Sequence, residues 1–252
     1  MKSPGTAGIQ RTAQSRNCPI SVRGWEGNLL VTDLAARKAT SASGHGQELV
    51  KRVLDITLSL VLIVIAAPLL LVLWCLVQST SAGPALFQQE RLGRHMQPFV
   101  MMKLRTMYVG NDDRTHRAYV TSMLSTEEEA AARNGALFKL TGDPRVTPVG
   151  RWLRRTSLDE LPQLINVLRG DMSLVGPRPM LQWEAQLLAA AYRPRFTVKP
   201  GITGLWQVSG RSRVSMRRAL ELDVEYVRRR NILFDLAILA RTVPALFRGG
   251  AN

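Results

Sequence analysis

The chain contains few of the residues that build disulfide frameworks, zinc sites and base-stacking surfaces. It has two cysteines, Cys18 in a polar segment and Cys75 in an apolar run, which argues against a disulfide framework and fits a reducing compartment. The three histidines are scattered, so no zinc-type cluster of cysteine and histidine is present. Aromatic residues make up only 6% of the chain. A basic stripe interleaved with aromatic residues, typical of nucleic-acid binders, is therefore not expected.

Acidic residues are scarce compared with basic ones. The 252 residues include 34 Lys and Arg against 19 Asp and Glu, a net charge of +15. Such a surplus indicates an anionic partner, which could be nucleic acid, anionic lipid or a phosphorylated small molecule. Charge alone does not distinguish these three, but the low aromatic content argues against nucleic acid.

One long segment has no charged residue. Ile56 to Val77, ITLSLVLIVIAAPLLLVLWCLV, is an uncharged run of 22 residues, preceded by Lys51, Arg52 and Asp55. This length suits a bilayer. It begins too far along the chain for a signal peptide, and no small-residue cleavage site follows it. A buried core helix is the alternative, but such helices need fewer apolar residues.

A re-entrant path fits the run better than a simple crossing. Pro68 lies near its middle, where proline removes a backbone hydrogen bond and kinks a helix. Residues 1–52 carry a net charge of +5 and the remaining residues +10, so both flanks are basic. A crossing would place one basic flank outside, against the positive-inside tendency. We therefore expect a helix that enters one leaflet, bends at Pro68 and returns.

The rest of the chain predicts a mostly helical α+β protein. We expect a disordered tail over 1–46, a re-entrant membrane helix over 47–78 and one further domain, on the cytoplasmic face, over 79–247. Two short strands, LFQQERLG and QPFVMMKLRTM, predict a β-hairpin, and residues 108–135 form a polar surface excursion.

Further along, GRWLRRTSLDELPQLINVLRG has helical spacing, GLWQVSGR is a candidate strand, and Arg217 to Phe247 predict amphipathic interfacial helices. Arg228, Arg229 and Arg230 could contact anionic lipid or form a solvated face. A core position is more usual for Trp206 than ring stacking on a ligand. Asp223 and Tyr226, one turn apart, predict a surface hydrogen bond.

The adjacent carboxylates Asp159 and Glu160 allow two interpretations. Ser157 followed by Glu160 is a capping-box pattern, and Asp159 in a first turn suits the helix dipole. Alternatively, side chains about 100° apart on a helix could perform two different tasks, one attacking phosphorus and one holding Mg²⁺. Cations that could hold phosphate flank the pair on both sides: Lys103, Arg105, Arg151, Arg154, Arg155 and Arg178.

Four segments together resemble one known family. KRVLD before the proline-broken apolar helix, VMMKLRTM, DPRVTPVGRWLRRTSLDELPQLINVLRGDMSLVGPRP and KPGITGLWQVSGR are similar to the bacterial sugar transferases, the monotopic polyprenyl-phosphate phosphoglycosyl transferases. The resemblance covers roughly residues 48–245 and is to the minimal catalytic form, because the extra N-terminal helices of larger members have no counterpart. Some relatives have Ser-Pro at the membrane break, where this chain has Ala67-Pro68, which leaves the bend angle less certain.

The resemblance implies a ping-pong reaction at the cytoplasmic face of the bacterial inner membrane. A UDP-sugar gives UMP and a phosphosugar on Asp159, polyprenyl phosphate then takes the sugar phosphate, and Glu160 binds Mg²⁺. It also implies phosphate contacts for Lys103, Arg154 and Arg178. Nucleotide contacts are implied for Gly201, Thr203, Gln207 and Arg211. The implied partners are the UDP-sugar, polyprenyl phosphate, membrane lipid and downstream glycosyltransferases, with no nucleic acid.

A catalytically inactive membrane scaffold with the same fold is the main alternative function. The intact Asp159, Glu160 and Arg178 argue against it. The sequence does not indicate which sugar is transferred or the oligomeric state.

Overall fold

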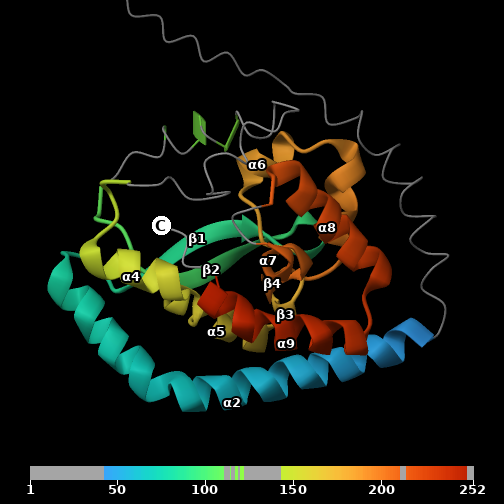
Figure 1. The fold of residues 1–252 in the computed structure, drawn as a ribbon, viewed down its shortest axis with the longest axis horizontal. Helices are drawn as coiled ribbons and strands as arrows, with labels where there is room; N and C mark the ends of the chain where they lie inside the picture. Colours follow the sequence, from blue (N-terminus) through green and yellow to red (C-terminus); the bar gives the residue numbers. More distant parts are fainter. Residues whose placement is uncertain are drawn as a thin grey trace, which may run out of the picture. The chain divides into compact units, whose positions relative to one another are not determined.

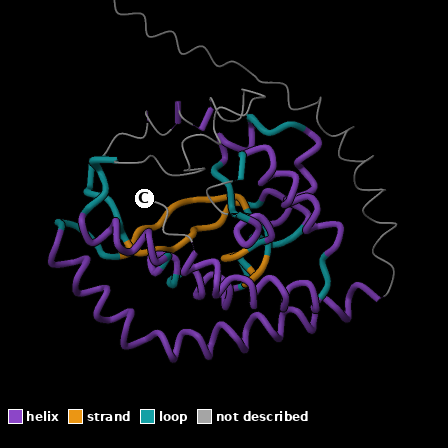
Figure 2. Tube along the Cα trace, in the orientation of Figure 1, coloured by secondary structure: helices purple, strands orange, loops and turns teal. Residues whose placement is uncertain are grey.

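The computed structural model describes residues 43–110, 114, 117–118, 120–121, 143–210 and 214–248. Contacts divide the chain into Met1–Ser41 and Ala42–Asn252, and every described residue belongs to the second unit. Almost all of the predicted tail and most of the predicted polar excursion lie outside the described residues. Most of the described structure is helical, with two small sheets (Figures 1 and 2).

The predicted membrane helix lies within α2, Ser43–Thr80, a single helix that contains Pro68. Its ribbon runs along one side of the domain and changes direction part-way (Figure 1). Among the described residues, α2 alone is long and apolar enough to cross a membrane, judged by length and composition. Only 11% of its most apolar window is buried, so this is not the core helix of the domain.

Both halves of α2 contact the same domain. Near its start, Arg52 donates hydrogen bonds to the carbonyl oxygens of Val167 (2.6 Å) and Leu168 (2.8 Å), at the end of α5, Gln163–Arg169. The guanidinium thus caps the C-terminal end of α5, where Val167 O also accepts a hydrogen bond from Gly170 N at 3.1 Å. The C-terminal half of α2 packs into a separate buried cluster, which contains Leu73, Val77, Ala85, Leu104 and Leu153.

The predicted β-hairpin is confirmed. Strand β1, Leu86–Leu92, pairs antiparallel with β2, Pro98–Leu104. The short 3-10 turn η2, Arg94–Met96, joins them, with His95 and Met96 in the left-handed region at φ 56° and 59°. The two strands lie above α2 in Figure 2 and carry several of the basic side chains described below.

The predicted helical stretch around the carboxylate pair is broken into three pieces. Helix α4, Pro148–Thr156, begins where the Thr147 side chain accepts a hydrogen bond from Gly150 N at 2.9 Å. Ser157 then adopts φ 59°, and the one-turn 3-10 segment η4, Leu158–Glu160, follows it before α5. The left-handed Ser157 ends α4. Leu161 and Pro162, between η4 and α5, keep right-handed helical dihedral angles.

A second small sheet lies beside the hairpin. Strand β3, Ser173–Val175, pairs parallel with β4, Gly201–Thr203, and the segment between them includes α6, Gln182–Gln186, and the 3-10 helix η5, Ala190–Thr197. The predicted strand GLWQVSGR is wrong. Leu205–Ser209 instead form α7, which begins after the extended Gly204 that directly follows β4.

Two C-terminal helices form where Arg217 to Phe247 predicted amphipathic helices. Helix α8, Met216–Arg229, and α9, Ile232–Arg248, are separated at Arg230 and Asn231. The side chain of Asn231 accepts a hydrogen bond from Phe234 N at 2.9 Å, which caps the start of α9. Figure 1 shows α9 running along the first half of α2, and a buried cluster joins α5, α7, α8 and α9 to both small sheets.

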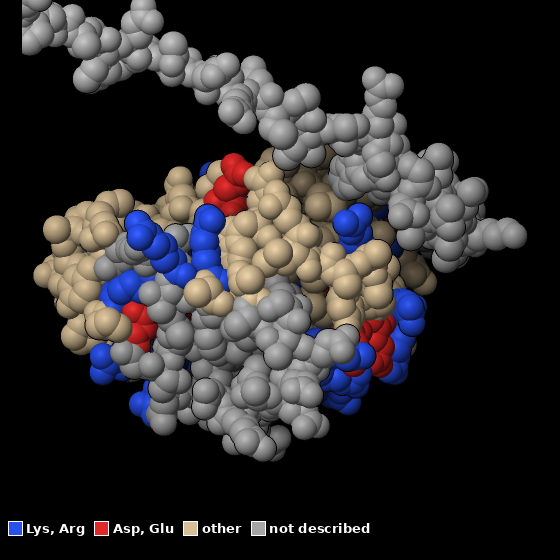
Figure 3. All heavy atoms as spheres, turned by 90° about the horizontal axis from the view of Figure 1, so that it is seen from above, with Lys and Arg blue, Asp and Glu red and all other residues tan. Residues whose placement is uncertain are grey.

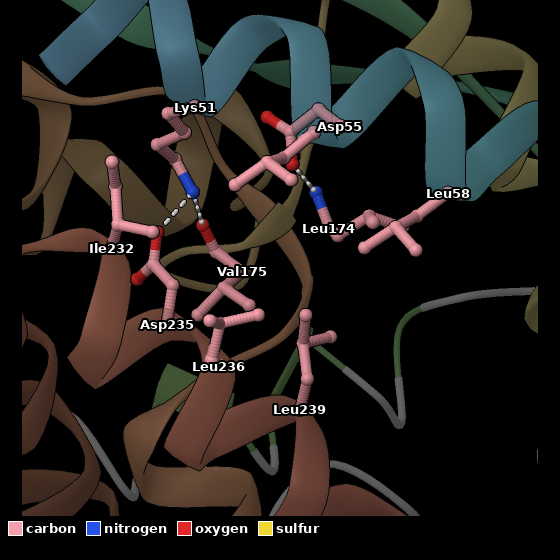
Figure 4. A pocket seen from close by; sticks show the side chains of 10 residues that line it. Lys51, Asp55, Leu58, Leu174, Val175, Ile232, Asp235, Leu236 and Leu239 are labelled. Atoms are coloured by element: carbon pink, nitrogen blue, oxygen red, sulfur yellow. Dashed lines mark hydrogen bonds and ion pairs between the residues drawn. The ribbon is translucent and has the colours of Figure 1, made fainter.

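Side chains of α2 and α9 hold the edge of β3. Lys51 Nζ donates to the carbonyl oxygen of Val175 (3.4 Å) and forms an ion pair with Asp235, and Asp55 Oδ1 accepts from Leu174 N at 3.1 Å (Figure 4). A small pocket beside these groups is lined on its other sides by leucine and isoleucine side chains. The strand that leads to Arg178 is therefore fixed directly to α2.

Asp223 and Tyr226 are buried, so the predicted surface hydrogen bond is wrong. The Tyr226 hydroxyl lies 3.1 Å from the carbonyl oxygen of Val175 and 2.8 Å from Asp235 Oδ1. Burial, together with the adjacent Asp235 carboxylate, raises the pKa of Tyr226. Asp223 instead forms an ion pair with Arg195.

Candidate active site

Asp159 and Glu160 lie in η4, immediately after the left-handed Ser157. Ser157 makes no side-chain capping hydrogen bond there, so the capping-box interpretation is wrong. The reason is that Ser157 ends α4 and does not begin a regular helix. Asp159 is buried, at 6% exposure, whereas Glu160 is partly exposed and its Oε1 accepts a hydrogen bond from Arg178 Nη1 at 3.2 Å. The two carboxylates therefore have different surroundings.

Two of the predicted cations act on Asp159. Burial lowers the pKa of Lys103, on β2, to about 7, and the Asp159 carboxylate opposes this shift. Burial also lowers the pKa of Arg154, on α4, again against the charge of Asp159. Arg154 Nε donates to Thr106 Oγ1 at 2.8 Å, which fixes the guanidinium. The structure therefore brings Lys103, Arg154 and Arg178 together around the carboxylate pair from three separate elements.

Arg91 is a fourth cation of this site, and it was missing from the sequence prediction. It lies on β1, where strand alternation places it on the same face of the hairpin as Lys103. Its guanidinium donates to Gln89 Oε1 (2.7 Å) and to the carbonyl oxygen of Pro179 (3.4 Å), and lies 3.7 Å from Glu184. Burial lowers the pKa of Arg91 to about 10. Alternation of side chains along the strand could have identified Arg91, once the pairing register of the hairpin was known.

Arg105 has a different role from the other cations. Its guanidinium donates to the carbonyl oxygens of Val77 (3.5 Å), Ser81 (2.7 Å) and Ala82. These carbonyls lie at and just beyond the C-terminal end of α2, so Arg105 connects the end of α2 to the hairpin. Its role is structural, and it does not join the cations around the carboxylate pair.

Arg178 lies in the segment Gly176–Pro179, which packs tightly against β4. Gly176 N donates to the carbonyl oxygen of Thr203 (2.9 Å), and Gly201 N donates to that of Pro177 (2.9 Å). A Cβ atom at Gly201 would lie 2.1 Å from Gly176 N, so this backbone approach requires glycine.

The predicted nucleotide contacts lie beneath this segment. Thr203 is buried, and its Oγ1 lies 2.8 Å from Thr242 Oγ1 on α9. Gln207 Nε2 donates to the carbonyl oxygen of Ile202 at 2.9 Å. Arg211 lies outside the described residues. Thr203 and Gln207 thus have contacts within the protein, and nucleotide binding by them stays a prediction.

Trp206, by contrast, is a buried member of the main hydrophobic cluster, as expected for a core residue. In Figure 3, Lys and Arg side chains lie in separate groups, with a few Asp and Glu side chains beside some of them.

The carboxylate pair could hold a divalent cation. In the part of the chain that the structure describes, no group of three or more His, Cys, Asp and Glu side chains is arranged for a metal. Mg²⁺ is commonly bound by one or two carboxylates together with substrate phosphates. Asp159 and Glu160 beside Lys103, Arg154 and Arg178 fit this pattern, with the partly exposed Glu160 as the accessible carboxylate.

Comparison with known proteins identifies the family of this chain. Residues 46–249 match the family of bacterial sugar transferases. The chain belongs to this family. Among its bacterial sugar transferase relatives is the undecaprenyl-phosphate galactose phosphotransferase of Salmonella typhimurium, 41% identical over 198 residues, which cover 79% of this chain and 40% of that protein.

Two other relatives match more of their own length. The exopolysaccharide production protein ExoY of Sinorhizobium fredii is 38% identical over 221 residues, covering 84% of this chain and 96% of that protein. The UDP-glucose:undecaprenyl-phosphate glucose-1-phosphate transferase of Caulobacter vibrioides is 41% identical over 207 residues, with 79% and 70% covered. The chain thus spans about two fifths of the Salmonella sugar transferase and nearly all of ExoY.

Proposed function

We propose that this protein transfers a sugar-1-phosphate from a UDP-sugar to a polyprenyl phosphate, such as undecaprenyl phosphate, and releases UMP. The observation that carries the proposal is the buried Asp159 carboxylate beside Lys103 and Arg154, next to the Glu160–Arg178 ion pair. The names of the relatives from Salmonella and Caulobacter support the same substrate classes. The lipid-linked sugar would be the first intermediate of exopolysaccharide or related glycan synthesis, which downstream glycosyltransferases extend.

In the first step, an Asp159 carboxylate oxygen attacks the phosphorus that bears the sugar. The bond from this phosphorus to the oxygen bridging the two phosphates breaks, and UMP leaves with that electron pair. Lys103, Arg154 and Arg178 offset the negative charge that collects on the phosphoryl oxygens. Burial of Asp159 removes competing water from the nucleophile.

In the second step, an oxygen of the polyprenyl phosphate attacks the same phosphorus. The bond to Asp159 breaks, which regenerates the carboxylate and gives the polyprenyl diphosphate sugar. Splitting the transfer in this way replaces one hard displacement with two easier ones. Mg²⁺ held by Glu160 would supply Lewis-acid stabilisation of phosphate charge.

The path of α2 through the membrane is part of the proposal. We infer that α2 enters and leaves the cytoplasmic leaflet of the bacterial inner membrane. Arg52 near its start and Leu73 and Val77 near its end contact one and the same domain, and the apolar stretch between them is exposed. If α2 crossed the bilayer, one of these contacts would be on the wrong side.

Cysteine labelling in spheroplasts tests this topology. The natural Cys18 and Cys75 are replaced by serine, and single cysteines are introduced at the exposed positions Gln47 and Gln88 on the two flanks of the apolar stretch. A membrane-impermeant thiol reagent should label neither cysteine until the cells are lysed. Labelling of one flank in intact spheroplasts would contradict re-entry.

Trapping of the intermediate tests the chemistry. Incubation with labelled UDP-sugar in the absence of polyprenyl phosphate should place label on the protein, and peptide mapping should locate it at Asp159. Asp159→Asn should lower turnover to background, because an amide cannot form the phosphoryl-aspartate. Glu160→Gln should be slowed severely, but added Mg²⁺ is expected to restore a small part of the rate. Label on Glu160, or turnover in Asp159→Asn, would reverse the two roles.

A further inference from the structure

A buried ion pair lies behind the segment that carries Arg178. Arg195, on η5, and Asp223, on α8, are 4% and 2% exposed, and Arg195 Nη2 lies 2.7 Å from Asp223 Oδ2. The same Nη2 atom donates to the main-chain carbonyl oxygen of Arg178, also at 2.7 Å. The guanidinium therefore connects α8 directly to the backbone of an active-site residue.

Burial of the Arg195–Asp223 ion pair is energetically unfavourable. Burial raises the pKa of Asp223 to about 6, although Arg195 and Arg178 both oppose this shift. Arg195 Nε and Asp223 Oδ1 make no hydrogen bond with the described part of the chain. Buried ion pairs contribute little net stability compared with apolar side chains of the same volume. Stability alone therefore gives a weak reason for this pair.

An apolar pair would fill the space but could not hold the carbonyl group of Arg178. Opposite that carbonyl, the Arg178 side chain contacts Glu160 Oε1 at 3.2 Å. On the other flank of the segment, Pro179 accepts a hydrogen bond from Arg91. The Arg195 hydrogen bond thus fixes Arg178. Arg178 connects the proposed phosphate clamp, formed by Lys103, Arg154 and Arg178, to the carboxylate pair.

We propose that Arg195 and Asp223 are positioning residues, which orient Arg178 toward Glu160 and the phosphates of the substrate. Both side chains are almost fully buried and contact the active site through the backbone of Arg178. Asp223 fixes the guanidinium of Arg195, and Arg195 fixes the backbone of Arg178. This inference rests on the proposed phosphosugar transfer for its effect on rate, but its structural part does not depend on that function.

The test replaces the pair by apolar side chains of similar size, Arg195→Met together with Asp223→Leu. Removing only one partner would leave a buried charge and could unfold the protein, whereas the double change should keep the thermal unfolding midpoint. Misplacement of a clamp by about 1 Å can cost on the order of 100-fold in rate. We expect a loss of this size in kcat for UMP release, with a smaller change in KM for the UDP-sugar.

Two comparisons separate positioning from general damage. Arg195→Lys keeps one charge-assisted contact and should be faster than the apolar pair. The control is the exposed pair Arg217 and Glu221, also on α8 and 3.3 Å apart, and Arg217→Gln with Glu221→Gln should leave turnover unchanged. Unchanged kcat in the buried double variant, with an active wild type, would overturn the proposal.

Hydrogen exchange measured by mass spectrometry tests the structural part without activity. In the double variant, the peptide over residues 174–182 should exchange several-fold faster than in the wild type, while peptides from α2 should not change. If the wild type transfers no sugar but this peptide exchanges faster, the proposed function fails and the positioning role stands. Equal exchange in variant and wild type would refute the positioning role.

Discussion

The protonation state of Lys103 should control the affinity for the UDP-sugar. Burial lowers the pKa of Lys103 from 10.5 to about 7, which corresponds to roughly 5 kcal/mol against the ammonium form in the free protein. A bound phosphate favours the ammonium and raises this pKa again. Below pH 7 the amine is already protonated when substrate binds. Above pH 7 each binding event must take up a proton, so affinity falls as pH rises.

The expected result is a KM for the UDP-sugar that is flat below pH 7 and rises up to about tenfold per pH unit above it. Lys103→Met removes the titrating group. Its KM should be high at pH 6 and should not change further up to pH 9. The assay is the initial rate of UMP release at several UDP-sugar concentrations across this range.

The exposed Arg217 provides the control, because Arg217→Met removes a cation outside the site and should keep the wild-type pH profile. A wild-type KM that does not vary between pH 6 and pH 9 would refute the argument. So would a Lys103→Met variant that retains the slope, because the titrating group would then lie elsewhere.

Three other changes follow from particular contacts. Gly150→Ala would place a Cβ atom 2.1 Å from the carbonyl oxygen of Thr106. Thermal unfolding in detergent should therefore show a free energy of unfolding lower by about 1–3 kcal/mol. Gly46→Ala, whose Cβ atom would have nothing within 4 Å, should not lower it. An equal midpoint for both alanine variants would contradict this packing argument. Arg91→Ala should lower kcat/KM for UMP release by about 10- to 1,000-fold if Arg91 belongs to the phosphate clamp, and wild-type turnover would remove it from the site. Pro68→Leu restores a backbone hydrogen bond and should straighten α2. One flank should then become accessible to an impermeant thiol reagent. An unchanged labelling pattern would mean that Pro68 does not determine the path of α2 through the membrane.

Local patterns were enough to predict several elements. The uncharged run with Pro68 predicted α2, and two short strand-like segments on either side of residues 93–96 predicted the β-hairpin. Both depend on the order of neighbouring residues, which sequence shows directly. The grouping of Lys103, Arg154 and Arg178 with the carboxylate pair came from a motif-level resemblance and a shared charge chemistry, and the structure brings these residues together.

Predictions failed where long-range packing selected the backbone conformation. The Ser157–Glu160 spacing matches a capping box, but the left-handed conformation of Ser157 ends α4 instead. The segment after Gly204 has the composition of a strand, yet it forms α7 because β4 has already ended. In both places, tertiary contacts outweigh intrinsic helix and strand propensities, which are only about a few tenths of a kcal/mol per residue.

By itself, the sequence determined the long apolar helix, the hairpin, the family and the types of side chain in the active site. Each of these depends only on the order and composition of the residues. Only the tertiary structure decided that Arg91 joins the site, that Arg105 caps α2, and that Arg195 and Asp223 support the backbone of Arg178. The physical reason is distance along the chain. An arginine on a strand or a 3-10 helix has the same local signature whether it meets solvent, a helix end or a buried carboxylate, and only packing determines which of these lies within hydrogen-bonding reach.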